Sequence, residues 1–415
     1  MNVDAERLRA DIERNATFGA LDVECGRGRT VLTGSEADRL ARERLVDRLT
    51  DAGLTVRIDR VGNIAGYWVP DSADEDTAPV VLGSHLDSVP RGGIFDGPLG
   101  VYGAFEAIRA IQSSEYEPTR PLGVGCFTEE EGARFGVGTL GSSVAAGKRS
   151  AVEALSLTDD AGVTLEQRLT NIGFSGTDEI DAAEWSAWLE LHIEQGTRLT
   201  DAGAAVGIVD SVTGLTNCEV TITGEANHAG TTAMADRTDA LAAASEFVLE
   251  VEAVGRSVAA EHSTAVVTVG EGSIEPNARN IVPGAVTLQL DIRDVDCDRM
   301  DDLVAQCRDC LFRVAQDRAV ETSFERYRDT EPTHLSQRCL AASRTAATTT
   351  GAQFLELHSA AMHDTATVAD VTDSGLLFAP SKDGISHNPR EWTSWEDCAA
   401  AVTVLAESAA ALATE

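Results

Sequence analysis

Four short stretches of the sequence concentrate the histidine and carboxylate side chains that bind divalent metals in proteins. They are GSHLDSVPRGGIFDG (83–97), EEEGARFG (129–136), LELHIEQG (189–196) and DGISHNPREW (383–392). The 415 residues include only 8 histidines, and three of them, His85, His192 and His387, lie in these stretches. This concentration of imidazoles beside acids indicates metal chemistry.

Each of these residues taken alone has an ordinary structural interpretation. A histidine that ends an apolar strand is often a satisfied core residue, and an aspartate such as Asp96 is common in turns. Together, however, the stretches supply two histidines after strands, one histidine in a loop, one aspartate able to bridge, and three consecutive glutamates that repel one another. This set suits a pair of divalent ions with open coordination positions.

The elements that must position these residues alternate between helix and strand in the first half of the chain. The predicted helices are 5–17, 35–52 and 101–112, and the predicted strands are 55–59, 64–68, 79–83, 122–128 and 189–192. This alternation predicts an α/β fold with a largely parallel sheet. Sites in such sheets lie at the carboxyl ends of the strands, which is where the metal-binding stretches begin.

The pattern changes near residue 203 and predicts a second domain. A strand, a helix, two strands, a helix and a strand follow one another, which is the order of a ferredoxin-like α+β sandwich. They are residues 217–223, 237–254, 264–270, 286–293, 297–317 and 321–327. After residue 330 the α/β pattern returns. We therefore predict a discontinuous catalytic domain, 1–211 and 330–415, with an inserted domain at 212–329.

The charge balance excludes several classes of partner. The chain has 68 acidic and 33 basic residues, a net charge of −35, and we expect it to bind neither nucleic acid nor anionic membranes. The acids are spread along the chain, which favours adaptation to high salt over a docking surface for a cationic partner. Neither a long apolar run nor a signal-peptide pattern occurs, so we expect a cytoplasmic protein.

The cysteines do not predict a second metal site. Eight are scattered along the chain, and only Cys307 and Cys310 form a CxxC pair, inside a predicted helix and without a partner pair. A structural zinc site needs four ligands. We expect free thiols in a reducing compartment.

Three further motifs complete a pattern that resembles a known family. They are GEANHAGTTAM (224–234), PNARNIVPG (276–284) and DIRD (291–294). In order and over nearly the whole chain, the motifs resemble the amidase, hydantoinase/carbamoylase branch of the M20 metallopeptidase-like hydrolases. That branch includes N-carbamoyl-L-amino acid hydrolases, allantoate amidohydrolases and β-ureidopropionases. Six separate motifs, with PNARNIVPG and DIRD counted as one, make the resemblance specific.

The resemblance implies a pair of divalent ions, Zn, Mn, Co or Ni. One is held by His85, Asp96 and His192, and the second by Asp96, Glu131 and His387. The histidine at position 192, where the peptidase branch commonly has a carboxylate, favours the amidase branch.

The resemblance also assigns roles around the metals. Asp87 orients His85, and Glu130 is the general base, with Glu129 as the next candidate. The inserted domain serves as a lid and a dimerisation domain. Its His228 donates to the developing oxyanion and reaches into the partner subunit's site of a homodimer.

Three residues are implied to contact the substrate. Arg293 binds its carboxylate, Asn280 binds the same group or the ureido group, and Gln195 contacts the carbamoyl amide. Without the resemblance, Arg293 reads as an ordinary surface ion-pair partner. Relatives carry a glycine-rich GAGHDA stretch where this chain has Ser359 to Asp364, which leaves the substrate's identity open.

We therefore expect a metal-dependent amidohydrolase that cleaves a carbamoyl or ureido C–N bond of a small carboxylate, with an N-carbamoyl-L-amino acid first among the substrates. The alternatives are an allantoate amidohydrolase or β-ureidopropionase, and then an aminoacylase or dipeptidase. A catalytically silent binding protein of the same fold is a different class of explanation. It is disfavoured because no expected metal ligand or base is missing from the sequence.

Overall fold

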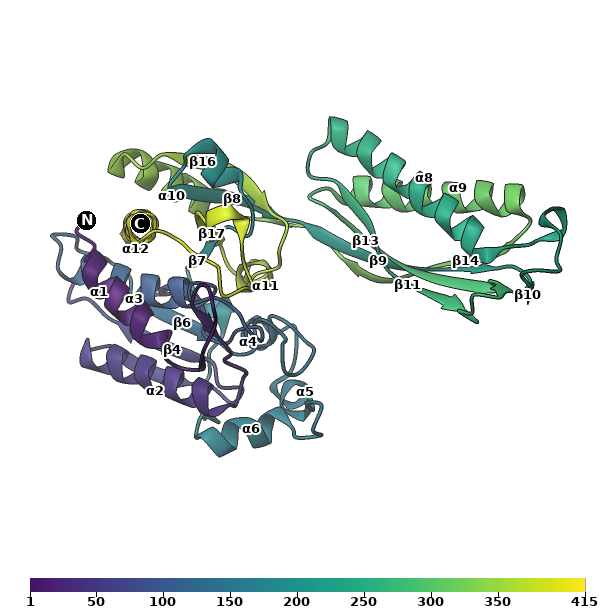
Figure 1. Ribbon diagram of the computed structural model, residues 1–415. Coiled ribbons are helices and arrows are strands. Elements are labelled where there is room, and N and C mark those ends of the chain that lie inside the picture. The colour runs from purple at the N-terminus through teal and green to yellow at the C-terminus, as the bar shows by residue number, and fades with distance from the viewer. Residues whose placement is uncertain (415) are drawn as a thin grey trace. The chain divides into compact units, whose positions relative to one another are not determined.

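The computed structural model describes residues 1–414, which divide into two compact units (Figure 1). The first unit contains Met1–Asp210, Leu335–Leu357 and the chain from Ala361 onward. The second contains Ser211–His334 and the short segment His358–Ala360. The chain leaves the second unit after His334 rather than after residue 329, because β15 (Thr333–His334) pairs with Ser211 and Val212.

The first unit is built on a mixed sheet in the order β8-β17-β7-β5-β6-β4-β3. The strands are β3 (Thr55–Ile58), β4 (Ile64–Trp68), β5 (Val80–His85), β6 (Leu122–Phe127), β7 (Ala187–Ile193), β8 (Val206–Val212) and β17 (Ser374–Ala379). The four central strands, β17, β7, β5 and β6, run parallel, and the outer strands pair antiparallel. The predicted α/β fold is confirmed.

Helices cover both faces of this sheet, which is why its central strands are buried at every position. The larger core contains residues of α1 (Ala5–Asn15), α2 (Glu36–Asp51), α3 (Pro98–Gln112), α10 (Gln337–Thr350) and α12 (Trp395–Ala413). On the other face, Val81 and Trp188 pack with residues of α4 (Leu140–Ala145) and α11 (Asp364–Val368). Alternate residues of β5 thus enter different cores.

Two short helices between residues 150 and 172 were not expected from the periodicity of the sequence. They are α5 (Ala151–Ser156) and α6 (Leu165–Ile172). Each begins with a capping box, formed by Ser150 with Glu153 and by Thr164 with Gln167. This spacing of Ser or Thr and Glu or Gln is a readable helix-start signal.

The second unit is a four-stranded antiparallel sheet with two helices. Its elements are β9 (Gly214–Thr223), α8 (Ala240–Glu261), β11 (Val266–Glu275), β13 (Ala285–Asp294), α9 (Cys297–Arg318) and β14 (Glu321–Thr330). The strand order β11-β13-β9-β14 is ferredoxin-like, and Figure 1 shows both helices on one face. Buried and half-buried residues alternate along β13, as expected for a sheet covered on one side.

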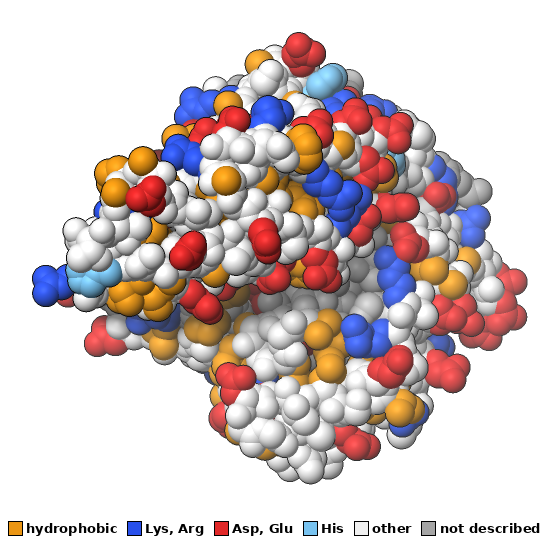
Figure 2. Space-filling model, turned by 90° about the vertical axis from the view of Figure 1, so that its right-hand side faces the viewer, with side chains coloured by type: hydrophobic (Ala, Val, Ile, Leu, Met, Phe, Trp, Pro, Cys, Tyr) orange, Lys and Arg blue, Asp and Glu red, His pale blue; other side chains and the backbone are white. Residues whose placement is uncertain are grey.

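The surface carries the acidic character of the sequence. On the face drawn in Figure 2, carboxylate side chains are scattered rather than gathered into one patch. None of the helices within residues 1–414 is long and apolar enough to cross a membrane. Cys307 and Cys310 are buried free thiols in the core of the second unit, as expected.

Candidate metal centre

The metal-binding stretches meet at the carboxyl ends of four neighbouring parallel strands. His85 is the last residue of β5, and His192 is the residue before the last in β7. The three glutamates follow β6, and the loop carrying His387 follows β17. Residues as far apart in sequence as His85 and His387 therefore converge because their strands are neighbours.

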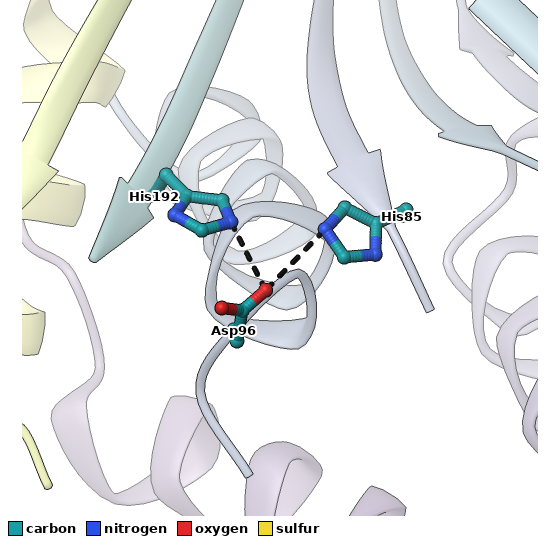
Figure 3. Close-up of side chains that lie close together, drawn as sticks. All are labelled: His85, Asp96 and His192. Carbon is teal, nitrogen blue, oxygen red and sulfur yellow. Dashed lines mark ion pairs between the residues drawn. The ribbon is translucent and has the colours of Figure 1, made fainter. Parts of the chain in front are cut away.

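The first set of ligands is His85, Asp96 and His192 (Figure 3). The Oδ1 atom of Asp96 lies 3.6 Å from Nε2 of His85 and 3.3 Å from Nε2 of His192. All three residues are buried. Backbone carbonyl groups lie 3.1 Å from the other ring nitrogen of each histidine, so both Nε2 atoms face the carboxylate.

The second set shares Asp96 and adds Glu131 and His387. Nε2 of His387 lies 3.6 Å from Oδ2 of Asp96 and 3.3 Å from Oε2 of Glu131. The two oxygens of Asp96 thus face different sets. This arrangement is the one expected of a carboxylate that bridges two ions.

The distances within both sets fit a metal better than direct hydrogen bonds. Charge-assisted N–H···O bonds are about 2.7–2.9 Å long. Tetrahedral coordination with metal–ligand distances of about 2.1 Å places neighbouring ligand atoms about 3.4 Å apart. The observed separations are 3.3 to 3.6 Å, and the buried Nε2 of His85 has no hydrogen-bond partner. These residues can hold two divalent ions.

The electrostatics of the centre also fit bound cations. Burial lowers the pKa of His85 to about 3, which keeps its imidazole neutral and able to act as a ligand. Burial also opposes the ionisation of His192, but Asp96 outweighs it and raises the pKa of His192 to about 10, so a metal that binds this ring must displace a proton. Burial and the charge of Asp96 raise the pKa of Glu131 to about 9. Divalent ions would offset the repulsion among these buried carboxylates.

A glycine allows Asp96 to approach His85. Gly97 has a φ of +79°, in the left-handed region, and forms the turn that leads into α3. A Cβ atom at this position would lie 2.6 Å from Cε1 of His85. In the FDG sequence, Gly97 therefore both forms a turn and lets the backbone come close to the ring of His85.

Asp87 acts on two parts of the centre. Its backbone carbonyl lies 3.1 Å from Nδ1 of His85, whereas its carboxylate is 3.6 Å from that atom. The carboxylate instead accepts the backbone N–H groups of Glu130 and Glu131, at 3.2 Å each. The expected orienting contact to His85 is thus made chiefly by the backbone, and the side chain fixes the glutamate loop.

The structure separates the roles of the three glutamates. Oε1 of Glu129 accepts the backbone N–H groups of Arg134 and Phe135, so this buried residue holds its own loop. Oε2 of Glu130 lies 3.6 Å from Nε2 of His85. Burial, and then the nearby charge of Asp364, raise the pKa of Glu130 well above its usual range. Glu130 is the glutamate that faces the ligands without belonging to either set.

Gln195 lies against the metal ligands. Its Nε2 donates to Oδ2 of Asp96 at 3.3 Å and to Oγ of Ser386 at 3.0 Å. Ser386 in turn donates to the same oxygen of Asp96, at 2.8 Å. The side chain predicted to contact substrate therefore first orients the shared carboxylate.

Two predicted residues of the second unit lie close together. His228 in β10 (Asn227–His228) pairs with Ile281 of β12 (Ile281–Val282), directly after Asn280. Both His228 and Asn280 are exposed. Nδ1 of His228 accepts the N–H groups of Gly230 and Thr231, which places the proton of the neutral ring on the free Nε2.

The guanidinium of Arg293 is already engaged within the second unit. It donates to both carboxylate oxygens of Asp291, at 2.8 and 3.2 Å, and to the carbonyl of Ala360 at 2.8 Å. The side chain remains 37% exposed. A substrate carboxylate at Arg293 would have to share or displace the contact with Asp291.

Sequence reasoning missed two buried residues that contact the ligand loops. Arg29 lies in β2 (Gly28–Arg29), a short strand with no metal-binding motif. Glu391 is the glutamate of the HNPRE sequence, of which only the histidine was predicted to belong to the site. Both contact the backbone beside Asp96. Glu391 could have been found because it lies four residues after the ligand His387. No motif around Arg29 could have indicated its role.

Comparisons with known proteins find relatives along nearly the whole chain. The model of peptidase family M20/M25/M40 matches residues 81–411. An N-carbamoyl-L-amino acid amidohydrolase of Geobacillus stearothermophilus is 34% identical over 407 residues, covering 97% of each chain. A ureidoglycolate hydrolase of Arabidopsis thaliana is 33% identical and covers 100% of this chain and 88% of that protein.

A solved structure gives the same result for the fold. An amidase of the hydantoinase/carbamoylase family from Burkholderia multivorans superposes with a TM-score of 0.92, at 35% identity, covering 100% of this chain and 98% of that one. The match extends over both units. With its two ligand sets meeting on Asp96, the chain belongs to peptidase family M20/M25/M40 and, within it, to the hydantoinase/carbamoylase amidases.

Proposed function

We propose that this protein is a two-metal amidohydrolase that cleaves the ureido C–N bond of a small carboxylate, with an N-carbamoyl-L-amino acid as its substrate. The observation that carries the proposal is the pair of ligand sets that share Asp96, with the carboxylate of Glu130 beside them. The relatives named above include an N-carbamoyl-L-amino acid amidohydrolase and a ureidoglycolate hydrolase. Both relatives are named after compounds that carry a ureido group near a carboxylate.

Two divalent ions held by these residues would supply an activated water and polarise the scissile carbonyl. Zn, Mn, Co and Ni all suit a donor set of imidazoles and carboxylates. Glu130 takes the proton of the attacking water at its carboxylate and delivers it to the leaving nitrogen. Asp87 fixes the position of Glu130 through the backbone.

His228 donates to the oxyanion that forms at the substrate carbonyl. Its Nδ1 is occupied by two backbone N–H groups, so its Nε2 is the available donor. A fixed donor of this kind stabilises the transition state more than the ground state. We place His228 in the partner subunit's site of a homodimer formed through the second unit.

Arg293 and Asn280 hold the substrate's carboxylate, and Gln195 contacts its carbamoyl amide. An arginine fork matches a carboxylate in geometry. To bind the substrate, Arg293 must give up its hydrogen bonds to Asp291, and this loss offsets part of the free energy of binding. We therefore expect moderate affinity at this subsite.

The test measures ammonia release in molar salt with added Mn, Co, Ni or Zn. The substrates are N-carbamoyl-L-amino acids, N-carbamoyl-β-alanine, allantoate and ureidoglycolate, and the control enzyme is Glu130→Gln. We expect metal-dependent turnover, fastest with an N-carbamoyl-L-amino acid and lost in the control. Turnover of another of these compounds instead would reassign the substrate. Absence of any turnover with metals bound would overturn the proposal and favour acylated amino acids, dipeptides or a binding role.

A further inference from the structure

We propose that Glu391, supported by Arg29, is a positioning residue that holds the loops of the second ligand set together and thereby sets the affinity of the second metal. This inference rests on the proposed two-metal function. It concerns residues that touch neither substrate nor metal, and it predicts that the two metal positions respond differently to one substitution.

Glu391 joins two ligand loops that are distant in sequence. Its Oε1 accepts the backbone N–H of Phe95 at 2.9 Å and that of Asp96 at 3.0 Å. Glu391 is 1% exposed and lies four residues after His387 in the same loop. A single carboxylate oxygen therefore ties the bridging ligand Asp96 to the segment that carries His387.

The chain makes room for this contact with a glycine. A Cβ atom on Gly93 would lie 2.2 Å from both Cδ and Oε1 of Glu391. Alanine or any larger residue at position 93 would therefore force the side chain of Glu391 or the loop to move. The RGGIFDG sequence thus contains both the glycine that leaves space for Glu391 and the ligand Asp96.

Arg29 ties the same region to the third ligand loop. It is fully buried, and its guanidinium donates to the carbonyls of Gly93 and Leu86, at 3.1 Å each. Its backbone N–H donates to Gly92 at 3.0 Å. Leu86 directly follows the ligand His85. Arg29 therefore connects the His85 segment to the loop that leads to Asp96.

Arg29 and Glu391 are also electrostatic partners. Burial lowers the pKa of Arg29, and among the nearby acids Glu391 offsets this most strongly. Each keeps one buried atom without a hydrogen-bond partner, Nη1 of the arginine and Oε2 of the glutamate. Removing the charge of Glu391 would leave the buried guanidinium with less compensation from the surrounding acids.

The two ligand sets differ in how they are built, which is why the second should depend on Glu391. His85 and His192 lie on buried parallel strands. Glu131 and His387 lie on loops; His387 has a φ of +53° and its side chain is 48% exposed. A non-glycine residue in this region of φ persists only when its surroundings hold it. Strands hold the two histidines of the first set, whereas the position of His387 relative to the shared Asp96 depends on the bond from Glu391 to the backbone of Asp96.

The experiment titrates metal-free protein with Co²⁺ and records both stoichiometry and the visible spectrum, for the wild type, Glu391→Ala and Glu391→Gln. The matched control is Glu396→Ala, an exposed carboxylate nearby in sequence. We expect the wild type to bind two equivalents. In Glu391→Ala we expect the first to bind normally and the second about 10–100-fold more weakly, as for other residues that orient ligands.

Glu391→Gln keeps an oxygen for the two N–H groups but loses the charge that faces Arg29. We expect it to bind the second ion with an affinity between those of the wild type and Glu391→Ala. If the alanine variant does not fold, as judged by circular dichroism, the glutamine variant carries the test. Unchanged second-site affinity and spectrum in the folded variants would overturn the inference. A wild type that binds fewer than two ions would instead overturn the proposed function.

Discussion

The carboxylate of Asp87 accepts the backbone N–H of Glu130 at 3.2 Å, and so links the segment after His85 to the proposed base. Asparagine at position 87 keeps one acceptor oxygen but places an amide donor where the second N–H group points. We expect Asp87→Asn to lower kcat or metal affinity by about 10–100-fold, as for other groups that orient ligands. Steady-state kinetics and metal titration measure both. Wild-type values in each would contradict the assignment.

Glu130 itself should be required for chemistry and dispensable for metal binding. Glu130→Gln removes the proton acceptor and leaves both ligand sets complete, so we expect kcat to fall by about 10²–10⁴ with two ions still bound. The matched control is Glu129→Gln, which retains an oxygen for the N–H groups of Arg134 and Phe135. Equal loss in both variants would mean that the loop, and not the base, had been disturbed.

Removal of metal should abolish activity reversibly. Incubation with a chelator followed by desalting should leave a folded protein that regains turnover on addition of Mn, Co, Ni or Zn.

His387→Ala should reduce the bound metal from two ions to about one, because His387 belongs only to the second set. His262→Ala, which alters an exposed histidine of the second unit, is the control. Full activity in the chelated protein would contradict a metal mechanism.

Complementation tests whether His228 acts across a dimer. Alone, His228→Ala should lose about 10²–10³ in kcat, as expected for an oxyanion donor. Co-expressed with Glu130→Gln, it should recover on the order of a quarter of wild-type activity, because half of the dimers are mixed and each has one intact site.

The control for this experiment pairs Glu130→Gln with His85→Ala. Each of these changes disables the site of the subunit that carries it, so mixed dimers have no intact site and should stay inactive. No recovery with His228→Ala would place the histidine in its own subunit's site. Recovery in the control as well would show that the regained activity does not come from an exchange of His228 between subunits.

The charge of −35 predicts a strong dependence on salt. Raising KCl from 0.1 M to 1 M shortens the screening length from about 10 Å to about 3 Å, which weakens repulsion among surface acids. We expect the melting temperature and activity to rise over this range. Sucrose, which does not screen charge, is the control. A melting temperature that is insensitive to KCl would contradict adaptation to salt.

The elements that carry the ligands could be predicted because their signals are local. The apolar runs before His85 and Glu129 match β5 and β6, and the alternation at 286–293 matches β13. Strand ends were less certain, so His192 was expected at the end of its strand and lies one residue inside β7. Periodicity alone sufficed to establish an α/β fold.

Contacts between a side chain and a distant backbone could not be predicted. Arg29 reads as an ordinary strand residue because its partners, the carbonyls of Leu86 and Gly93, carry no sequence signal. The ion pair between Arg293 and Asp291 could not be predicted either. Residues two positions apart lie on the same face of every strand, so this spacing permits a contact without establishing one. Such contacts depend on the tertiary path of the chain.

The order of the ligands along the chain affects how the centre can be assembled during synthesis. The first set is complete once His192 has been made, whereas the second lacks a ligand until His387 has emerged, after the whole of the second unit. A nascent chain that stops before residue 387 therefore has one complete ligand set and not two. A product truncated before residue 387 would therefore retain the complete ligands of the first set alone.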